Sequence, residues 1–212
     1  MCTGRVDLSF VVRAFLRGAD GVIIGGCWPG ECHYVTEGNY DALGNLHLGK
    51  LLLGQIGLRP ERFRLEWIAA SEGSRFAEVM SDFARQLKEL GPLGEVEGLD
   101  DTALKLKLEA VNRLIPYLRL VEREKLRVAT RSEKAYKEFY ESAAVQRLLD
   151  DLIADKLVQS QILLLLGEGP RSSSEISEQL GLTSSAVARH MNSSSGQGLV
   201  RYDEERASYA LA

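Results

Sequence analysis

Two patterns of hydrophobic positions alternate along the N-terminal part of the chain. Short segments rich in β-branched, aromatic and aliphatic residues at positions 22–24 and 63–68 are typical of buried strands. Residues 7–17, 39–55 and 71–90 place apolar side chains three or four positions apart, which is the spacing of a helix face. Strands that alternate with helices at short intervals imply parallel crossovers. The pattern predicts an α/β domain with a small parallel sheet and flavodoxin-like topology.

The predicted α/β domain spans residues 1–94. After residue 94 the strand pattern stops. Residues 95–156 keep helical spacing and carry charges of both signs, so we interpret them as a helical linker. Residues 157–212 form a third unit. Its predicted elements are helices at 157–166, 172–180 and 184–191, followed by strands at 198–202 and 208–211. Helices and a two-stranded hairpin in this order predict a winged-helix-like domain.

Composition narrows the class of protein. The chain has 212 residues, 45% hydrophobic and 26% charged, which is typical of a globular protein with room for more than one core. Its net charge of −4 leaves no polycationic surface for nucleic acid or anionic lipid. No run has the length of a membrane span, and the N-terminus lacks a signal-peptide pattern. We expect a cytoplasmic protein without a membrane partner.

The candidate chemistry lies in the loop after the first predicted strand, where Cys27 and Cys32 stand five positions apart. Loops at the carboxyl ends of parallel strands are where ligands bind, and closely spaced cytosolic cysteines favour metal or redox chemistry. Gly25 and Gly26 allow the backbone to approach an inorganic cluster closely. The alternative is that both thiols pack as small hydrophobic residues.

Four motifs in sequence order carry a resemblance. They are Cys-Thr-Gly-Arg-Val-Asp at residues 2–7, Gly-Ala-Asp-Gly-Val at 18–22, Gly-Cys-x-Pro-Gly-x-Cys-His-Tyr at 26–34 and Leu-Glu-Trp-Ile-Ala-Ala-Ser-Glu-Gly at 65–73. Together they resemble the delta subunit family of methyl-viologen-reducing hydrogenases. The resemblance implies a [2Fe–2S] cluster, and we expect Cys2, Cys27 and Cys32 to be its ligands in this chain.

The same resemblance implies the function of an electron-transfer subunit in a cytosolic oxidoreductase complex, not catalytic alone. Its expected donor is a hydrogenase or a formate-dehydrogenase-like subunit. Its expected acceptor is a flavin-containing, heterodisulfide-reductase-type subunit. Beside the cluster, we expect His33 to donate a hydrogen bond or shield the site. Trp28 is expected to face outward at a docking surface, and Ser71 or Glu72 to cap the helix that follows the second strand.

The family begins earlier, with a strand that ends in a Cys-x-x-Cys pair, and Met1 stands where the family is already in its second strand. We therefore expect further codons upstream, encoding an apolar strand and a Cys-x-x-Cys or selenocysteine-containing pair. Those residues would supply the fourth ligand. The alternative for Cys2 is an exposed thiol at the end of the chain.

The C-terminal unit offers a different class of function. Residues 183–190 occupy the position of a recognition helix, so the alternative is a redox-responsive transcription regulator with a thiol sensor domain. From Ser160 onward, however, six acidic residues outnumber four basic ones. Phosphate contacts from basic residues supply most of non-specific DNA affinity. We expect the unit to dock onto protein and not onto nucleic acid.

Overall fold

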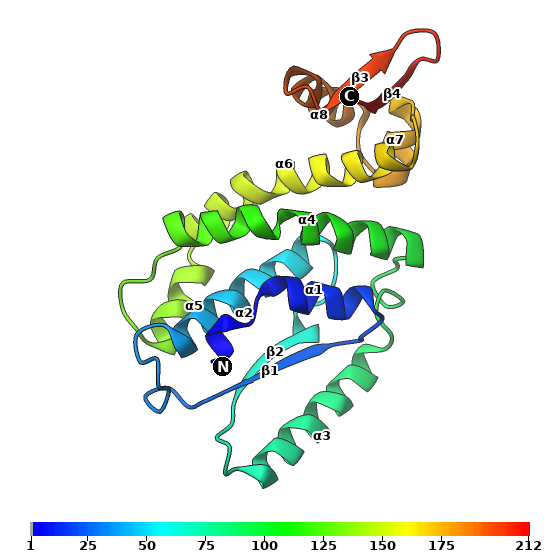
Figure 1. Ribbon diagram of the computed structural model, residues 1–212. Helices are drawn as coiled ribbons and strands as arrows, with labels where there is room; N and C mark the ends of the chain where they lie inside the picture. The colour runs from blue at the N-terminus through cyan, green and yellow to red at the C-terminus, as the bar shows by residue number, and fades with distance from the viewer. Residues whose placement is uncertain (1) are drawn as a thin grey trace.

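A parallel two-stranded sheet lies between helices in the N-terminal part of the computed structural model, which describes residues 2–212 (Figure 1). Its strands are β1 (Val22–Gly26) and β2 (Phe63–Trp67), which pair in parallel from Val22 opposite Phe63 to Gly26 opposite Trp67. Both strands end at the same edge, next to the cysteine-containing loop.

The helices of this part lie on opposite sides of the sheet: α1 and α2 above it in Figure 1, and α3 below. The elements around the strands are η1 (Thr3–Arg5), α1 (Leu8–Leu16), α2 (Gly38–Gln55), η2 (Pro60–Arg62) and α3 (Gly73–Leu90). The predicted alternation of strands and helices is confirmed. In the described part of the chain the sheet has two strands, so flavodoxin-like topology is confirmed only in its parallel crossover.

The start of α3 differs from the prediction. The helix begins at Gly73, and Glu72 at the N-cap position makes no capping hydrogen bond with its side chain. The expected capping by Ser71 or Glu72 is therefore wrong. The Glu72 carboxylate instead accepts hydrogen bonds from groups outside the helix, the indole of Trp28 and the amide of Ala69.

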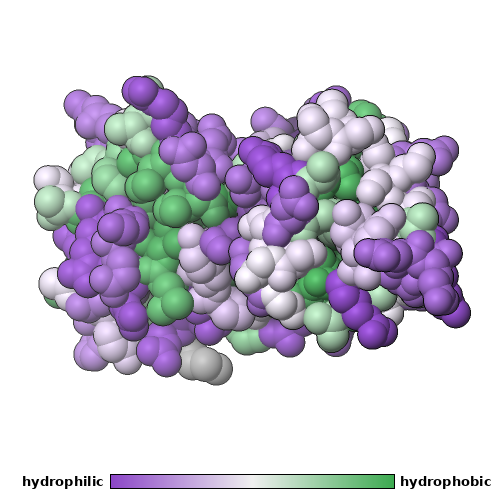
Figure 2. All heavy atoms as spheres, turned by 90° about the horizontal axis from the view of Figure 1, so that it is seen from above, coloured by the Kyte–Doolittle hydropathy of each residue, from purple (hydrophilic) through white to green (hydrophobic). Residues whose placement is uncertain are grey.

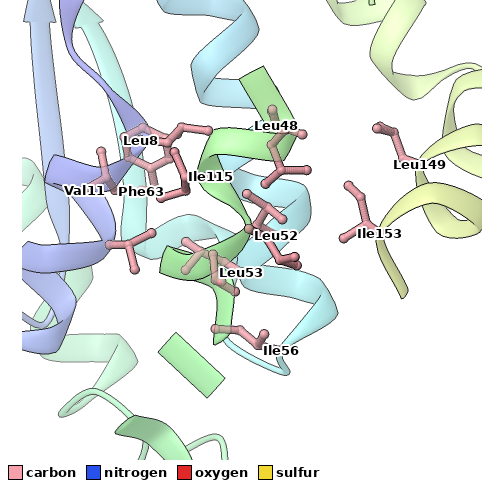
Figure 3. Packing of buried hydrophobic residues seen from close by; sticks show 14 of the residues in the cluster. Leu8, Val11, Leu48, Leu52, Leu53, Ile56, Phe63, Ile115, Leu149 and Ile153 are labelled. Atoms are coloured by element: carbon pink, nitrogen blue, oxygen red, sulfur yellow. The ribbon is translucent and has the colours of Figure 1, made fainter. Parts of the chain in front are cut away.

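Three helices cover the α/β part: α4 (Asp101–Lys125), α5 (Glu133–Glu141) and α6 (Ala143–Glu168). Each carries an apolar stripe that packs against α1 or α2, or against its neighbour, so the predicted linker region shares a core with the α/β part. Figure 3 shows side chains from several elements gathered in this core, among them Leu8, Leu52, Phe63, Ile115 and Ile153. The domain boundaries at residues 94 and 156 stay a prediction.

The C-terminal unit begins within α6, which continues into it from the main core without a break. A separate helix was expected to begin at residue 157, but α6 begins at Ala143 and runs on to Glu168 because its apolar positions continue across that point. The remaining elements are α7 (Ser173–Leu180), α8 (Ser184–Gly196), β3 (Val200–Asp203) and β4 (Ser208–Leu211). Gly181 ends α7 in the left-handed region, and Thr183 caps α8. This is the helix–turn–helix and hairpin order of the predicted winged-helix-like domain.

The surface is largely hydrophilic. In the view from above, Figure 2 shows hydrophobic residues gathered mainly in the left half, with hydrophilic residues around them. Within residues 2–212, every helix is too short or too polar to cross a membrane.

A fully buried arginine joins the α/β part to the chain beyond α3. Arg62, at the end of η2, forms an ion pair with Glu97 at 2.8 Å, and both side chains are almost completely inaccessible to solvent. Its other donors bind the backbone carbonyls of Asp20 and of residues 90–92, at 3.0–3.3 Å. Glu97 also accepts a hydrogen bond from the amide of Gly94. One guanidinium therefore satisfies polar groups from three separate segments.

Replacing Arg62 with methionine is expected to lower the free energy of unfolding by about 3–5 kcal/mol, because Glu97 is left buried without its counter-ion. Urea unfolding measures the change. Adding Glu97→Gln to Arg62→Met should restore part of the loss, since no buried charge then remains. The control is Arg85→Met, which removes an arginine whose side chain is 71% exposed, and it should change stability by less than about 0.5 kcal/mol. Equal effects of the two single substitutions would contradict this role of Arg62.

Candidate functional site

Two of the three cysteines meet at the edge where β1 ends. Cys2 precedes η1, and Cys32 lies in the loop between β1 and α2. Their Sγ atoms are 3.7 Å apart. Cys32 is buried, Cys2 is half-buried, and both are free thiols. Residues thirty positions apart in the sequence thus form one dithiol.

The separation of the two sulfurs fits a shared metal atom. A disulfide would need an S–S distance of about 2.05 Å. Two thiolates on one tetrahedral metal, each bound at about 2.3 Å, would stand about 3.8 Å apart. The 3.7 Å between the Cys2 and Cys32 sulfurs is close to that edge, and it is also the distance of a hydrogen bond between two thiols.

Gly38, the first residue of α2, allows the two sulfurs to lie against the helix N-terminus. A methyl group on its Cα would overlap the Cys32 sulfur and stand 3.0 Å from the Cys2 sulfur. The partial positive charge of a helix N-terminus favours thiolates. Gly38, in the Gly-Asn-Tyr sequence at residues 38–40, therefore lets both sulfurs approach the backbone at the N-terminus of α2, whose partial positive charge favours the thiolate form.

The pKa of the Cys2 thiol is raised above its ordinary value. Burial is the largest cause, and the neighbouring Cys32 and Cys27 add to it, while a hydrogen bond from the backbone of Gly4 acts in the opposite direction. Two adjacent thiolates repel each other, so ionising this pair requires a positive charge beside it. A bound metal would supply that charge.

Cys27 lies in the same loop but is exposed. Its backbone carbonyl accepts a hydrogen bond from the buried amide of Asn39 on α2. Among residues 2–212, no group of three or more Cys, His, Asp or Glu side chains is placed to hold a metal ion. The structure thus pairs Cys2 with Cys32 and leaves the third predicted ligand outside the pair.

Trp28 anchors the loop to the start of α3. Its Nε1 donates a hydrogen bond of 2.7 Å to Glu72, whose carboxylate also accepts the amide of Ala69 at 2.7 Å. The guanidinium of Arg75 lies 4.8 Å from the centre of the indole ring. Trp28 is half-buried by these contacts, and they, with Asn39, hold the loop from both sides. The sequence singled out Trp28 and Glu72 separately, and nothing in their spacing linked them.

His33 is exposed, and its ring packs edge-on against Tyr34 at 5.2 Å between centroids. It makes no hydrogen bond to a cysteine among the described contacts. Its expected part in shielding the site or donating a hydrogen bond stays a prediction.

Comparison with known proteins identifies the N-terminal part. The profile of the methyl-viologen-reducing hydrogenase delta subunit matches residues 1–91. The iron-sulfur subunit of an F420-non-reducing hydrogenase from Archaeoglobus profundus is 55% identical over 91 residues, which are 43% of this chain and 66% of that protein. The corresponding protein of Methanopyrus kandleri is 34% identical over 43% of this chain and 69% of its own. The chain belongs to the methyl-viologen-reducing hydrogenase delta subunit family.

A second kind of relative is much larger. One chain of a CoB-CoM heterodisulfide reductase from Methanosarcina acetivorans is 45% identical over 94 residues, which make up 44% of this chain and 12% of that protein. The matched region therefore also occurs as a small part of a reductase chain.

The C-terminal unit resembles a different family. The profile of the arsR family of bacterial regulatory proteins matches residues 158–202. This stretch runs from the second half of α6 through α7 and α8 into β3, and so covers the helix–turn–helix.

Gly38→Ala is expected to move the Cys2 and Cys32 sulfurs apart, because the new methyl group occupies their position. Mild oxidation of the purified chain with diamide should give a Cys2–Cys32 disulfide, and Gly38→Ala should lower its yield severalfold in peptide mass mapping. The control is Gly54→Ala on the same helix, where the nearest atom lies 3.9 Å away and the yield should not change. The same yield in both variants would contradict the close approach at Gly38.

Proposed function

We propose that this chain is the electron-transfer subunit of a cytoplasmic oxidoreductase complex, and that Cys2, Cys27 and Cys32 hold part of a [2Fe–2S] cluster. The observation that carries the proposal is the 3.7 Å approach of the Cys2 and Cys32 sulfurs at the first residue of α2. This pair falls within the part that matches the delta subunit family. Relatives named as iron-sulfur subunits support an iron–sulfur cofactor.

When bound, such a cluster accepts and releases single electrons. The residues that would hold it are the adjacent Cys2 and Cys32, together with Cys27 from the exposed part of the same loop as Cys32. Gly38 leaves room for the sulfurs, while Asn39 and Glu72 position the loop. Since only an electron moves, no general acid or base is required, and the subunit is not catalytic alone.

The proposed partners follow from the relatives. The matching iron-sulfur proteins of F420-non-reducing hydrogenases support a hydrogenase donor. A formate-dehydrogenase-like subunit is the alternative donor of the proposal. The matching segment within chains of CoB-CoM heterodisulfide reductases supports an acceptor of that type, which we propose contains a flavin. Closely spaced cysteines that bind metal or do redox chemistry are typical of a reducing compartment, which supports the proposed cytoplasmic location.

Anaerobic reconstitution of the full chain with ferrous iron and sulfide tests the ligand set. Three thiolates are one short of the usual four, so the chain is expected to hold a labile, substoichiometric cluster. Cys27→Ser and Cys32→Ser should each abolish its visible absorption and the EPR signal of the reduced state. His33→Asn, the control in the same loop, should leave both signals in place. Unchanged spectra in the two cysteine variants would remove these residues from the site.

The C-terminal unit is proposed to dock the chain onto a partner protein. Three large hydrophobic side chains beside or within its hairpin are exposed: Leu199, Tyr202 and Leu211. The one arginine on α8, Arg189, forms an ion pair with Asp155 of α6 at 3.1 Å. The only arginine of α8 thus has an acidic neighbour in an exposed ion pair, and apolar surface is available at the hairpin.

The match to the arsR family favours a second candidate, a redox-responsive transcription regulator in which the thiol pair senses oxidation. In that function α8 would enter the DNA major groove, with its exposed Ser184, Ser185 and Arg189 at the bases. The acidic balance from Ser160 onward supports protein docking over this alternative.

Fluorescence anisotropy with the full chain and labelled genomic duplexes distinguishes the two functions. We expect only salt-sensitive, non-specific binding, weaker than about 1 μM at physiological salt. Specific nanomolar binding that is lost in Ser184→Glu, at the start of α8, would favour the regulator. Ser174→Glu on α7 is the matched control, since it adds the same charge at another exposed helix start.

A further inference from the structure

Arginine recurs at every fourth position across the end of α4 and the segment that follows: Arg119, Arg123, Arg127 and Arg131. Arg119 and Arg123 stand four positions apart on α4, where like charges repel each other, and Arg127 and Arg131 follow in the non-helical segment after Lys125. Arg119 pairs with Asp7, and Arg123 with its exposed neighbour Glu124.

The last two arginines of the repeat find neutral partners. Arg127 donates to the backbone carbonyl of Arg123 at 2.6 Å, and Arg131 donates to the hydroxyl of Tyr136. Both are exposed and form no ion pair among the described contacts. Two of the four arginines thus have an acidic partner, and the positive charge of the other two is not neutralised by an ion pair among the described contacts.

These arginines line a pocket together with Arg5 of η1. The pocket has a volume of about 970 Å³ and lies between the start of the chain, α2, α5 and the end of α4. That volume is at the upper end of the range for small-molecule sites. The arginines therefore face a shared concavity instead of a flat surface.

Acceptor groups accompany the arginines in the pocket. Asp7, Asp41 and Glu122 also line it, and Glu122 is the most enclosed of the three: its carboxylate lies against Gly44 of α2, where a Cβ would stand 2.9 Å from Oε1. The pKa of Glu122 is raised to about 7, chiefly by burial and further by Asp41 and Asp7.

The charges of the pocket do not cancel. It has two more positive than negative side chains when Glu122 is ionised, and three more when Glu122 is protonated. The chain as a whole has a net charge of −4, so this excess is local.

We propose that this pocket binds a small molecule that carries two or more phosphate groups together with hydroxyl groups, of the nucleoside diphosphate class. Guanidinium groups bind phosphate oxygens in pairs, and successive arginines of the repeat reach neighbouring phosphates. The enclosed carboxyl group of Glu122 accepts a hydrogen bond from a ligand hydroxyl. About half of the lining, at residues 4–45, lies within the region that matches the delta subunit family, and the rest, at residues 119–140, lies beyond it. The site needs no cluster.

Isothermal titration calorimetry of the full chain tests the site, with pyrophosphate, ADP and citrate as probes. Pyrophosphate and ADP are expected to bind with micromolar Kd, ADP the more tightly, and citrate at least tenfold more weakly. Arg127→Gln and Arg131→Gln should each weaken ADP binding about tenfold. The control is Arg113→Gln, an exposed arginine of α4 outside the pocket, which should bind like the wild type.

Glu122→Gln gives an independent readout through pH. Protonating Glu122 removes a negative charge from the pocket, so anion binding should tighten as the pH falls through about 7. At pH 8, Glu122→Gln should bind pyrophosphate severalfold more tightly than the wild type, and at pH 6 the two should agree. Comparing the two proteins at each pH cancels the ionisation of the probe. The other charged or titratable groups that line the pocket with Glu122 are Arg5, Asp7, Tyr40, Asp41, Arg119, Arg123, Arg127, Arg131, Tyr136 and Tyr140.

Three results would overturn the proposal. One is that no phosphate probe binds at millimolar concentration. Another is that the Arg127 and Arg131 variants bind as tightly as Arg113→Gln, which would mean non-specific attraction. The third is that citrate binds as well as ADP, which would make the site a general anion surface. None of these results depends on iron or on the state of Cys2 and Cys32, so they leave the proposed electron-transfer function untouched.

Discussion

The buried ion pair of Arg62 and Glu97 is the constraint on which the arrangement of the two main layers depends. Arg62 immediately precedes β2, and its hydrogen bonds reach the segment before β1, the last turn of α3 and the loop that leads to α4. A guanidinium is suited to this position because it presents five donors in a fixed plane. It also lies among the C-terminal carbonyls of α3, where a helix favours positive charge. One side chain therefore connects the start of β2, the segment before β1, the end of α3 and the loop to α4, in addition to the shared hydrophobic core.

The thiol site uses a different principle, the close packing of small residues. Cys2 and Cys32 come from opposite ends of a thirty-residue stretch, and they meet because Gly38 occupies so little space. The loop between β1 and α2 is then held by side-chain hydrogen bonds to its backbone and to Trp28, and not by a core of its own. Cys27 remains on the solvent side of this arrangement. Such a site has a rigid base and one ligand-bearing segment that is open to a partner.

Much of the fold could be predicted from hydrophobic spacing, because helix and strand periodicities are local properties. The cysteine loop was also found locally, from Cys27, Cys32 and the glycines around them. What could not be predicted depends on contacts distant in sequence. Nothing in the sequence around Arg62 distinguishes it from a surface arginine, because the groups that bury it come from distant segments of the chain. The resemblance already predicted Cys2 and Cys32 in one site, but the structure was needed to show that Cys2, and not Cys27, contacts Cys32. The arginine repeat was visible in the sequence, but its meaning required the pocket that it lines.

The unbroken course of α6 has a mechanical consequence. Its first half lies in the main core, through residues such as Leu149 and Ile153, and its second half contributes Ile162 and Leu166 to the C-terminal core. A helix of 26 residues is about 39 Å long and resists bending. The C-terminal unit is therefore connected to the main core by a continuous helix and not by a flexible linker. A partner protein bound by the C-terminal unit is therefore held at a fixed distance and orientation from the Cys2 and Cys32 sulfurs, and the length of α6 sets that distance.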